Sequence, residues 1–153
     1  MLMTVRTIAD YQFGRGAGRV LFPESCEFLL SSTGRIRQVI DGGVRIATLK
    51  ADTGLLTLSV EGARRLKEIF EFPVWRVCVL NDVSEFIAMG RSVFAKHVVE
   101  VYDKIRPGDE VVIVNEDDEL LATGRAVLSA LEMKEFMKGV AVEVRQGVRS
   151  KSK

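Results

Sequence analysis

The chain has 153 residues, of which 47% are hydrophobic and 28% charged, and its net charge at pH 7 is +1. This length allows one ordinary domain or two small ones, and the composition is that of a globular protein rather than a disordered one. Its apolar runs, such as Val111 to Val114, fall far short of the roughly 20 residues of a membrane helix. The N-terminus lacks the features of a signal peptide, so the expected location is the cytoplasm.

The first part of the chain, to about residue 72, is predicted to form strands followed by one helix. Residues 19–23 end in a proline turn, and residues 26–32 are strand-like. The segment from Arg35 to Ala51 is a hairpin around the Asp-Gly-Gly turn. A further strand runs to Leu58, and Ser59 caps a helix whose apolar residues recur at helical spacing.

The second part restarts as a strand after Pro73. Residues 84–101 are predicted to run from a short strand through Gly90 into a helix. A second hairpin follows, with its turn in the acidic residues 116–119. A short helix stopped by Gly139 and a final strand over 140–146 complete the chain.

These elements predict an α+β protein of two domains. Residues 1–73 would form a small α+β module, and residues 74–148 a closed or half-closed β-barrel with short helices, which leaves few exposed sheet edges. Residues 149–153 are expected to be a loose tail.

Few residues in this sequence could carry catalysis or hold a metal. Cys26 and Cys78 lie far apart and His97 is the single histidine, so we expect free buried thiols, with a disulfide as the alternative, and no metal or other cofactor. No cysteine lies near His97, and Ser92 is predicted to cap the following helix. The acidic turn at 116–119 is more typical of a solvated loop than of a general acid and base. We therefore predict that the chain is not an enzyme.

Local clusters of cations matter more than the net charge. Arg15 and Arg19 flank a glycine-rich turn that lacks the Lys-Ser/Thr ending of a Walker motif, so phosphate contact and a plain flexible turn both stay open. Arg35 and Arg37 would share one face of a strand, where they could follow a phosphate backbone or simply be solvated.

The stretch from Met89 to Val98, "MGRSVFAKHV", is the strongest candidate for a binding surface. Gly90 would let another backbone approach, and the expected helix start would offer free amides to a phosphate. Arg91 and Lys96 would add charge, and Phe94 could stack on an unpaired base. The alternative places Phe94 in the core and leaves Lys96 solvated.

The same segment and those after it resemble a PUA domain, an RNA-binding module. The motifs that carry the resemblance are "RPGDEV" at 106–111, "ATGRA" at 122–126 and "KGVAVEVR" at 138–145, in the order of that family. Upstream, "IADYQFGRGAG", "SSTGRIRQV" and "IATLKADTGLLTLSVEGARRL" are similar to the domain that precedes PUA in archaeal tRNA-guanine transglycosylases. The resemblance implies an archaeal origin. It also implies a tRNA-binding part without the catalytic aspartates and zinc ligands of those enzymes, which this sequence does not contain.

By the family pattern, RNA would lie across the glycine-led segment and the last strand. The RNA-binding residues implied in this way are Gly90, Arg91, Ser92, Phe94, Ala95, Lys96 and His97, with Arg145 nearby. The acidic residues 116–119 would repel phosphate, so the bound strand should avoid that turn.

The function expected from the sequence is non-catalytic binding of structured RNA such as tRNA. One alternative is an accessory subunit of a split tRNA-modifying transglycosylase, whose partner would be the catalytic subunit. Another is a translation-associated factor that binds the ribosome.

Overall fold

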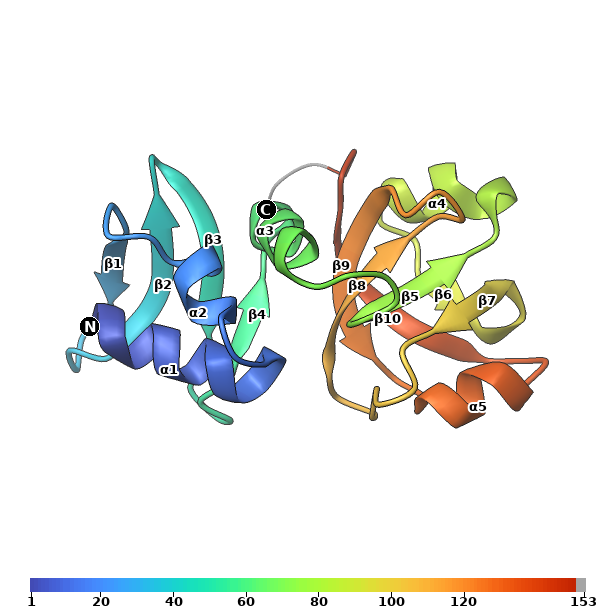
Figure 1. Ribbon diagram of the computed structural model, residues 1–153, viewed down its shortest axis with the longest axis horizontal. Helices are drawn as coiled ribbons and strands as arrows, with labels where there is room; N and C mark the ends of the chain where they lie inside the picture. Colours follow the sequence, from blue (N-terminus) through green and yellow to red (C-terminus); the bar gives the residue numbers. More distant parts are fainter. Residues whose placement is uncertain (151–153) are drawn as a thin grey trace. The chain divides into compact units, whose positions relative to one another are not determined.

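The computed structural model describes residues 1–150 and divides into two compact units, Met1–Ile69 and the part that begins at Phe70 (Figure 1). No helix among these described residues has the length and apolar character needed to cross a membrane.

The first unit contains three helices and one antiparallel sheet with the strand order β1-β2-β3-β4. Its elements, in chain order, are α1 (Leu2–Phe13), α2 (Ala17–Leu21), β1 (Glu27–Leu30), β2 (Ile36–Asp41), β3 (Val44–Leu49), β4 (Leu56–Leu58) and α3 (Val60–Ile69). The predicted β2–β3 hairpin and the helix after Ser59 are confirmed. The Ser59 hydroxyl accepts a hydrogen bond from the Gly62 amide and donates one to the Ile46 carbonyl, so it both caps α3 and ties it to β3.

The expectation that the first unit begins with strands is wrong, because α1 and α2 precede the sheet. Val5, Ala9 and Phe13 are buried at helical spacing along α1. Gly18 lets α2 approach α1 closely, since a Cβ at this position would lie 2.3 Å from the Arg6 carbonyl oxygen. Asp10 then accepts a hydrogen bond from the Gly18 amide at 2.7 Å. The glycines of "FGRGAGR" thus serve helix packing.

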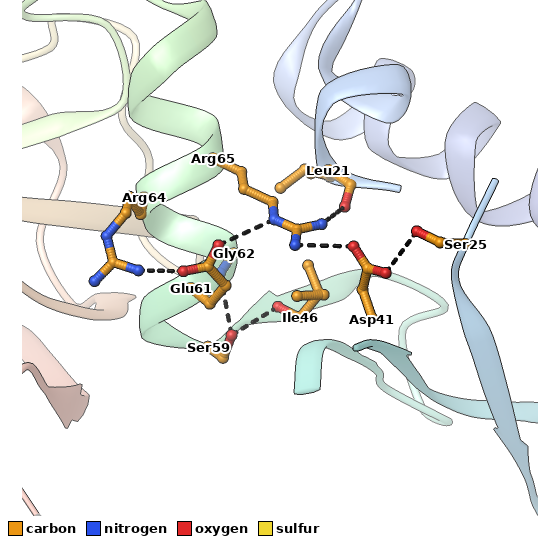
Figure 2. A network of polar contacts seen from close by, with 9 residues as sticks. All are labelled: Leu21, Ser25, Asp41, Ile46, Ser59, Glu61, Gly62, Arg64 and Arg65. Atoms are coloured by element: carbon orange, nitrogen blue, oxygen red, sulfur yellow. Dashed lines mark hydrogen bonds and ion pairs between the residues drawn. The ribbon is translucent and has the colours of Figure 1, made fainter. Parts of the chain in front are cut away.

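Arg65 joins three parts of the first unit (Figure 2). Its guanidinium donates to the Leu21 carbonyl at the end of α2 at 3.0 Å, and to Glu61 one turn earlier in α3 at 3.2 Å. It also forms an ion pair of 2.9 Å with Asp41 at the end of β2. One side chain therefore ties α2 and the sheet to α3.

The second unit is a nearly closed, six-stranded barrel with short helices, which confirms the predicted fold class (Figure 1). The strand order is β6-β10-β9-β8-β5-β7, with β5 and β8 parallel and the other pairs antiparallel. Its strands are β5 (Arg76–Val79), β6 (Val93–Phe94), β7 (Val98–Val101), β8 (Glu110–Val114), β9 (Leu120–Ala126) and β10 (Val140–Gly147). Its helices are α4 (Ser84–Ala88) and α5 (Ala130–Glu135), with the short 3₁₀ turns η1 (Asn81–Val83) and η2 (Ala95–His97). The barrel is filled by aliphatic side chains, among them Val77, Val111, Ile113 and Met133.

The prediction for residues 84–101 is wrong in its order. The helix α4 comes first and buries Ile87 and Ala88, Gly90 follows it, and the chain then becomes extended. Val93 and Ala95 are buried while Phe94 is exposed, which is the alternation of a strand. The strand β6 follows Gly90 where the helix was expected, and the short η2 after it begins at the N-cap residue Phe94, so Ser92 is not a helix cap.

Residues just after β10 are held by hydrogen bonds to the second unit. The Val148 amide donates to Leu121 and the Arg149 amide to Ala88, each at 2.9 Å. The Ser150 amide donates to Gly147. The loose tail expected over 149–153 is therefore hydrogen-bonded in its first two residues, and the remaining three lie outside the described part of the chain.

Candidate nucleic-acid interface

Gly90 stands at the end of α4, where the backbone takes a φ of +103° that favours glycine. Its amide donates to the Ile87 carbonyl, and the next amide, that of Arg91, donates to Phe86. Gly147 at the end of β10 packs against the same place, because a Cβ there would lie 2.2 Å from the Ala88 carbonyl oxygen. The glycine-led turn and the last strand are thus side by side, as the resemblance implied.

The helix polarity at Gly90 is the reverse of the sequence prediction. The glycine follows the carboxyl end of α4, where unpaired carbonyls carry partial negative charge, so no helix start is available to a phosphate. The groups that can still attract a phosphate are the cationic side chains. Both Arg91 and Lys96 are exposed.

Phe94 points outward from β6, and the interpretation that placed it in the core is wrong. Its side chain is 45% exposed, whereas its neighbours Val93 and Ala95 are 0% and 2% exposed. The ring meets the edge of His97 at a centroid distance of 6.2 Å and an interplanar angle of 84°. An aromatic ring held in this way at the surface, with Arg91 and Lys96 close in sequence, can stack on an unpaired base.

The other residues of the predicted set have more restricted roles. Ala95 lies in the core, and its amide donates to the Gly139 carbonyl at 2.9 Å. Ser92 and His97 are half-buried. Arg91, Phe94 and Lys96 are therefore the exposed members of the set, and Gly90, Ser92 and His97 are half-buried beside them in the sequence.

Arg145, also in the predicted set, is bound to a buried carboxylate. It donates two hydrogen bonds to Glu110 of β8, and its side chain is 34% exposed against 4% for Glu110. The Thr123 hydroxyl donates to the same carboxylate at 3.2 Å. The positive charge of Arg145 is thus already compensated by Glu110, unlike the charge of an exposed, unpaired cation.

Sequence reasoning missed the exposed segment 136–138 between α5 and β10. The helix ends at Glu135 rather than running to Gly139, and Phe136, Met137 and Lys138 are exposed. This segment adjoins β6, since Phe94 pairs with Val140 and Ala95 bonds to Gly139. A run of two large apolar residues before Lys-Gly was the signal in the sequence. The exposed Phe136 and Lys138 thus precede the residues that pair with β6.

The acidic hairpin tip is largely engaged within the second unit. Asp118 pairs with the buried Arg76 at 3.0 Å, and Glu116 accepts a hydrogen bond from the Asn81 amide at 2.9 Å. Asn115 holds the turn by accepting from the Asp117 and Glu119 amides. These acids therefore have structural roles in the hairpin.

Comparison with known families covers nearly the whole chain. Residues 3–73 match the patch-forming domain C2 of tRNA-guanine transglycosylase, and residues 75–148 match the PUA domain. The chain is a PUA-domain protein. Its two domains stand in the same order as in the C-terminal part of tRNA-guanine transglycosylases.

Curated relatives of this PUA-domain protein include tRNA-guanine(15) transglycosylases of archaea. That of Pyrococcus furiosus is 49% identical over 98% of this chain, and that of Methanothermobacter thermautotrophicus is 48% identical over 94%. The chain spans only 25% and 22% of the length of these two relatives. The likeness therefore concerns one part of each enzyme.

A solved structure has a similar fold over nearly the whole chain. A hypothetical protein from Pyrococcus horikoshii OT3 matches with a TM-score of 0.77 at 23% identity, over 98% of this chain and 91% of the other. At that identity the likeness shows the fold alone.

Proposed function

We propose that this PUA-domain protein binds structured RNA, such as tRNA, through its second unit. The observation that carries the proposal is the exposed Phe94 ring, held on β6 with Arg91 and Lys96 exposed on either side of it in the sequence. An aromatic ring can stack on a base while cations neutralise the neighbouring phosphates. His97 contacts the Phe94 ring, and Arg145 is held by Glu110 within the barrel.

The PUA match and the likeness to part of tRNA-guanine(15) transglycosylases support RNA as the ligand. Apart from the base that stacks on Phe94, the contacts would be mainly to the phosphate backbone and to the shape of the RNA. In such binding, the logarithm of the affinity falls as the logarithm of the salt concentration rises. Each neutralised phosphate steepens this slope by roughly 0.7 to 0.9.

The test is the binding of total tRNA at several salt concentrations. The double variant Arg91→Ala with Lys96→Ala should weaken binding about tenfold or more and make the salt dependence less steep by about 1.5 log units. The matched control removes two exposed cations elsewhere in the unit, by Lys104→Ala with Arg106→Ala. No binding by the unaltered chain at low salt, or equal loss in both double variants, would contradict the proposal.

A second candidate is an accessory role beside a tRNA-modifying catalytic protein. The observation that favours it is the 49% identity to a segment of enzymes about four times as long as the matched region. Affinity purification from a native extract should then recover a transglycosylase with the tagged chain. A chain recovered with RNA alone would leave RNA binding as its role.

A further inference from the structure

The first unit carries a surface groove of about 640 Å³ at one end of its sheet. It is lined by the start of β2, the end of β3 and the turn over residues 50–54 that follows β3. The groove lies entirely in the domain that precedes PUA, and neither family match assigns it a ligand.

The charge in this groove is strongly uneven. Arg35, Arg37 and Lys50 line it, and Asp52 is the one acidic residue in the lining. All four are exposed. Within the described part of the chain, the side chains of these three cations form no hydrogen bond or ion pair. Their positive charge is therefore available to a ligand.

Other arginines of the same unit are used differently. Arg64 and Arg65 both pair with Glu61, and Arg65 also pairs with Asp41, so their charge is compensated within the unit (Figure 2). The groove thus gathers cations that the fold itself does not use. A site for an anionic ligand requires such unpaired donors.

The arginines sit on a constrained piece of backbone. The Ser31 amide donates to the Arg35 carbonyl at 2.7 Å, and the Arg35 amide donates to the Ser31 hydroxyl. Arg37 follows within β2, whose Gln38 pairs with Thr48 of β3. The two guanidinium groups therefore start from a fixed turn and a paired strand, which lowers the entropy lost when a ligand is bound.

The rest of the lining suits a sugar–phosphate chain. Ser31, Thr33 and Thr48 offer hydroxyl groups, which commonly contact phosphate and sugar oxygens. Ile36 and Leu49 are half-buried and give the groove an apolar component against which a ribose or base can pack. Guanidinium groups match phosphate with two parallel hydrogen bonds.

We propose that this groove binds the phosphate backbone of RNA, as a second contact site on the same chain. The inference rests on the proposed function of the PUA unit and extends it to the preceding domain. An elongated RNA would then be held by two separate sets of cations, and binding by the intact chain would exceed that expected from the PUA surface alone.

The experiment measures total tRNA binding by the intact chain across a range of salt concentrations. The triple variant Arg35→Gln, Arg37→Gln and Lys50→Gln should weaken binding about tenfold or more at about 0.1 M salt and make the salt dependence less steep by about 2 log units. The matched control, Arg64→Gln, Lys104→Gln and Arg106→Gln, also removes three cations but none from the groove. It should change affinity less than about threefold, in line with loss of nonspecific charge alone.

Ultraviolet crosslinking followed by peptide mass spectrometry supplies the second readout. Nucleotides should be found on peptides from residues 31–54, and the triple variant should lose these crosslinks while those near Phe94 remain. Crosslinks confined to the PUA unit, or a triple variant that binds like its control, would overturn the groove proposal. An acidic polypeptide such as polyglutamate that displaces RNA from these crosslinks as well as unlabelled RNA does would also overturn it.

The two proposals fail in different ways. If the double variant of Arg91 and Lys96 loses affinity for RNA and the triple variant of the groove does not, the groove proposal is wrong and the PUA proposal stands. If the unaltered chain binds no RNA at low salt, both are wrong. The groove side chains are exposed, so the variants should keep the unfolding midpoint of the parent, which urea titration checks.

Discussion

Arg145 of β10 donates two hydrogen bonds to the carboxylate of Glu110, at 2.6 and 2.5 Å, across the intervening strand β9. Glu110 is almost completely buried, and Thr123 of β9 donates to the same group. The arginine expected to face RNA therefore also compensates a buried charge. Its removal would affect the barrel before it affects a ligand.

Arg145→Ala should lower the free energy of unfolding by about 2 to 3 kcal/mol, because it leaves Glu110 buried without its cation. Urea titration measures the change. The double variant Glu110→Gln with Arg145→Gln should lose less than the two single variants together, since the residues are coupled. An Arg145→Ala protein as stable as the parent, with a less steep salt dependence of RNA binding, would instead place this arginine on RNA.

Phe94→Leu should weaken RNA binding by about 1 to 3 kcal/mol, because it keeps an apolar side chain but removes the ring that stacks on a base. The salt dependence should stay that of the parent, since no charge is lost. Tyr11→Leu is the matched control, because Tyr11 is an 85% exposed aromatic residue of the other unit. Equal affinity in the Phe94→Leu and parent proteins would remove the stacking role.

Gly147→Ala should destabilise the second unit by about 3 kcal/mol or more, because its Cβ would meet the backbone of Ala88 and Gly90 rather than a side chain that can move. Gly108→Ala is the comparison. It adds a Cβ in open space and meets only the strain of a positive φ, about 1 kcal/mol. Similar unfolding midpoints for the two variants would contradict the close packing of β10 against the end of α4.

Asp41 should make the first unit less stable in acid. Its carboxylate accepts hydrogen bonds from the Ser25 hydroxyl and from Arg65, and these lower its pKa below the ordinary value of 3.8 (Figure 2). A lowered pKa in the folded chain stabilises it above the unfolded pKa, and this stabilisation is lost as the pH falls through the lower, folded value.

The Asp41→Asn variant should accordingly be less stable at pH 7 and lose less stability than the parent as the pH falls below the ordinary carboxyl pKa of 3.8. Urea titrations at several pH values measure this difference. Asp52→Asn is the control, since Asp52 is exposed and lines the groove. A parent and an Asp41→Asn protein with parallel pH profiles would show that the carboxylate is not linked to folding.

Cys78 should resist alkylation in the folded protein. Burial raises the pKa of its thiol to about 11, with a further contribution from the nearby Glu100, Glu116 and Asp118 carboxylates. Its thiol also donates to the Asn115 carbonyl at 3.3 Å. Because the thiolate is the reactive form, iodoacetamide at pH 8 should modify Cys78 mainly after unfolding.

Cys26 provides the internal comparison for that experiment. It is only partly buried, and burial followed by the charge of Asp41 raises its pKa as well. It should react more slowly than a free thiol but faster than Cys78, as peptide mass spectrometry over a time course would measure. Equal rates at the two cysteines would contradict the buried position of Cys78.

Local chemistry in the sequence was enough to predict several elements. The Asp-Gly-Gly turn and its flanking alternation predicted the β2–β3 hairpin, and Ser59 predicted the start of α3. The capping box formed by Ser129 and Glu132 shows why the region of α5 is also visible locally. In each case the determining groups lie within about four residues of one another.

Two segments were misassigned. In the first, Val5, Ala9 and Phe13 already have the helical spacing of α1, and Gly18 lets α2 pack against it. In the second, the elements have too few apolar residues for periodicity to decide. In residues 84–101, α4 and β6 have 5 and 2 residues, and each is selected by what it packs against. Val93, for example, pairs with Val142.

The sequence by itself determined the fold class and the order of two modules, because turns, caps and alternation are local properties. It singled out the stretch around Phe94 by its residue types and its family resemblance, although the helix start expected there is absent. Only the tertiary structure decided which side chains are free to bind. It paired Arg145 with Glu110, exposed Phe94 and left the groove cations Arg35, Arg37 and Lys50 uncompensated. Such roles depend on partners distant in the chain, which packing brings together and which no local pattern encodes.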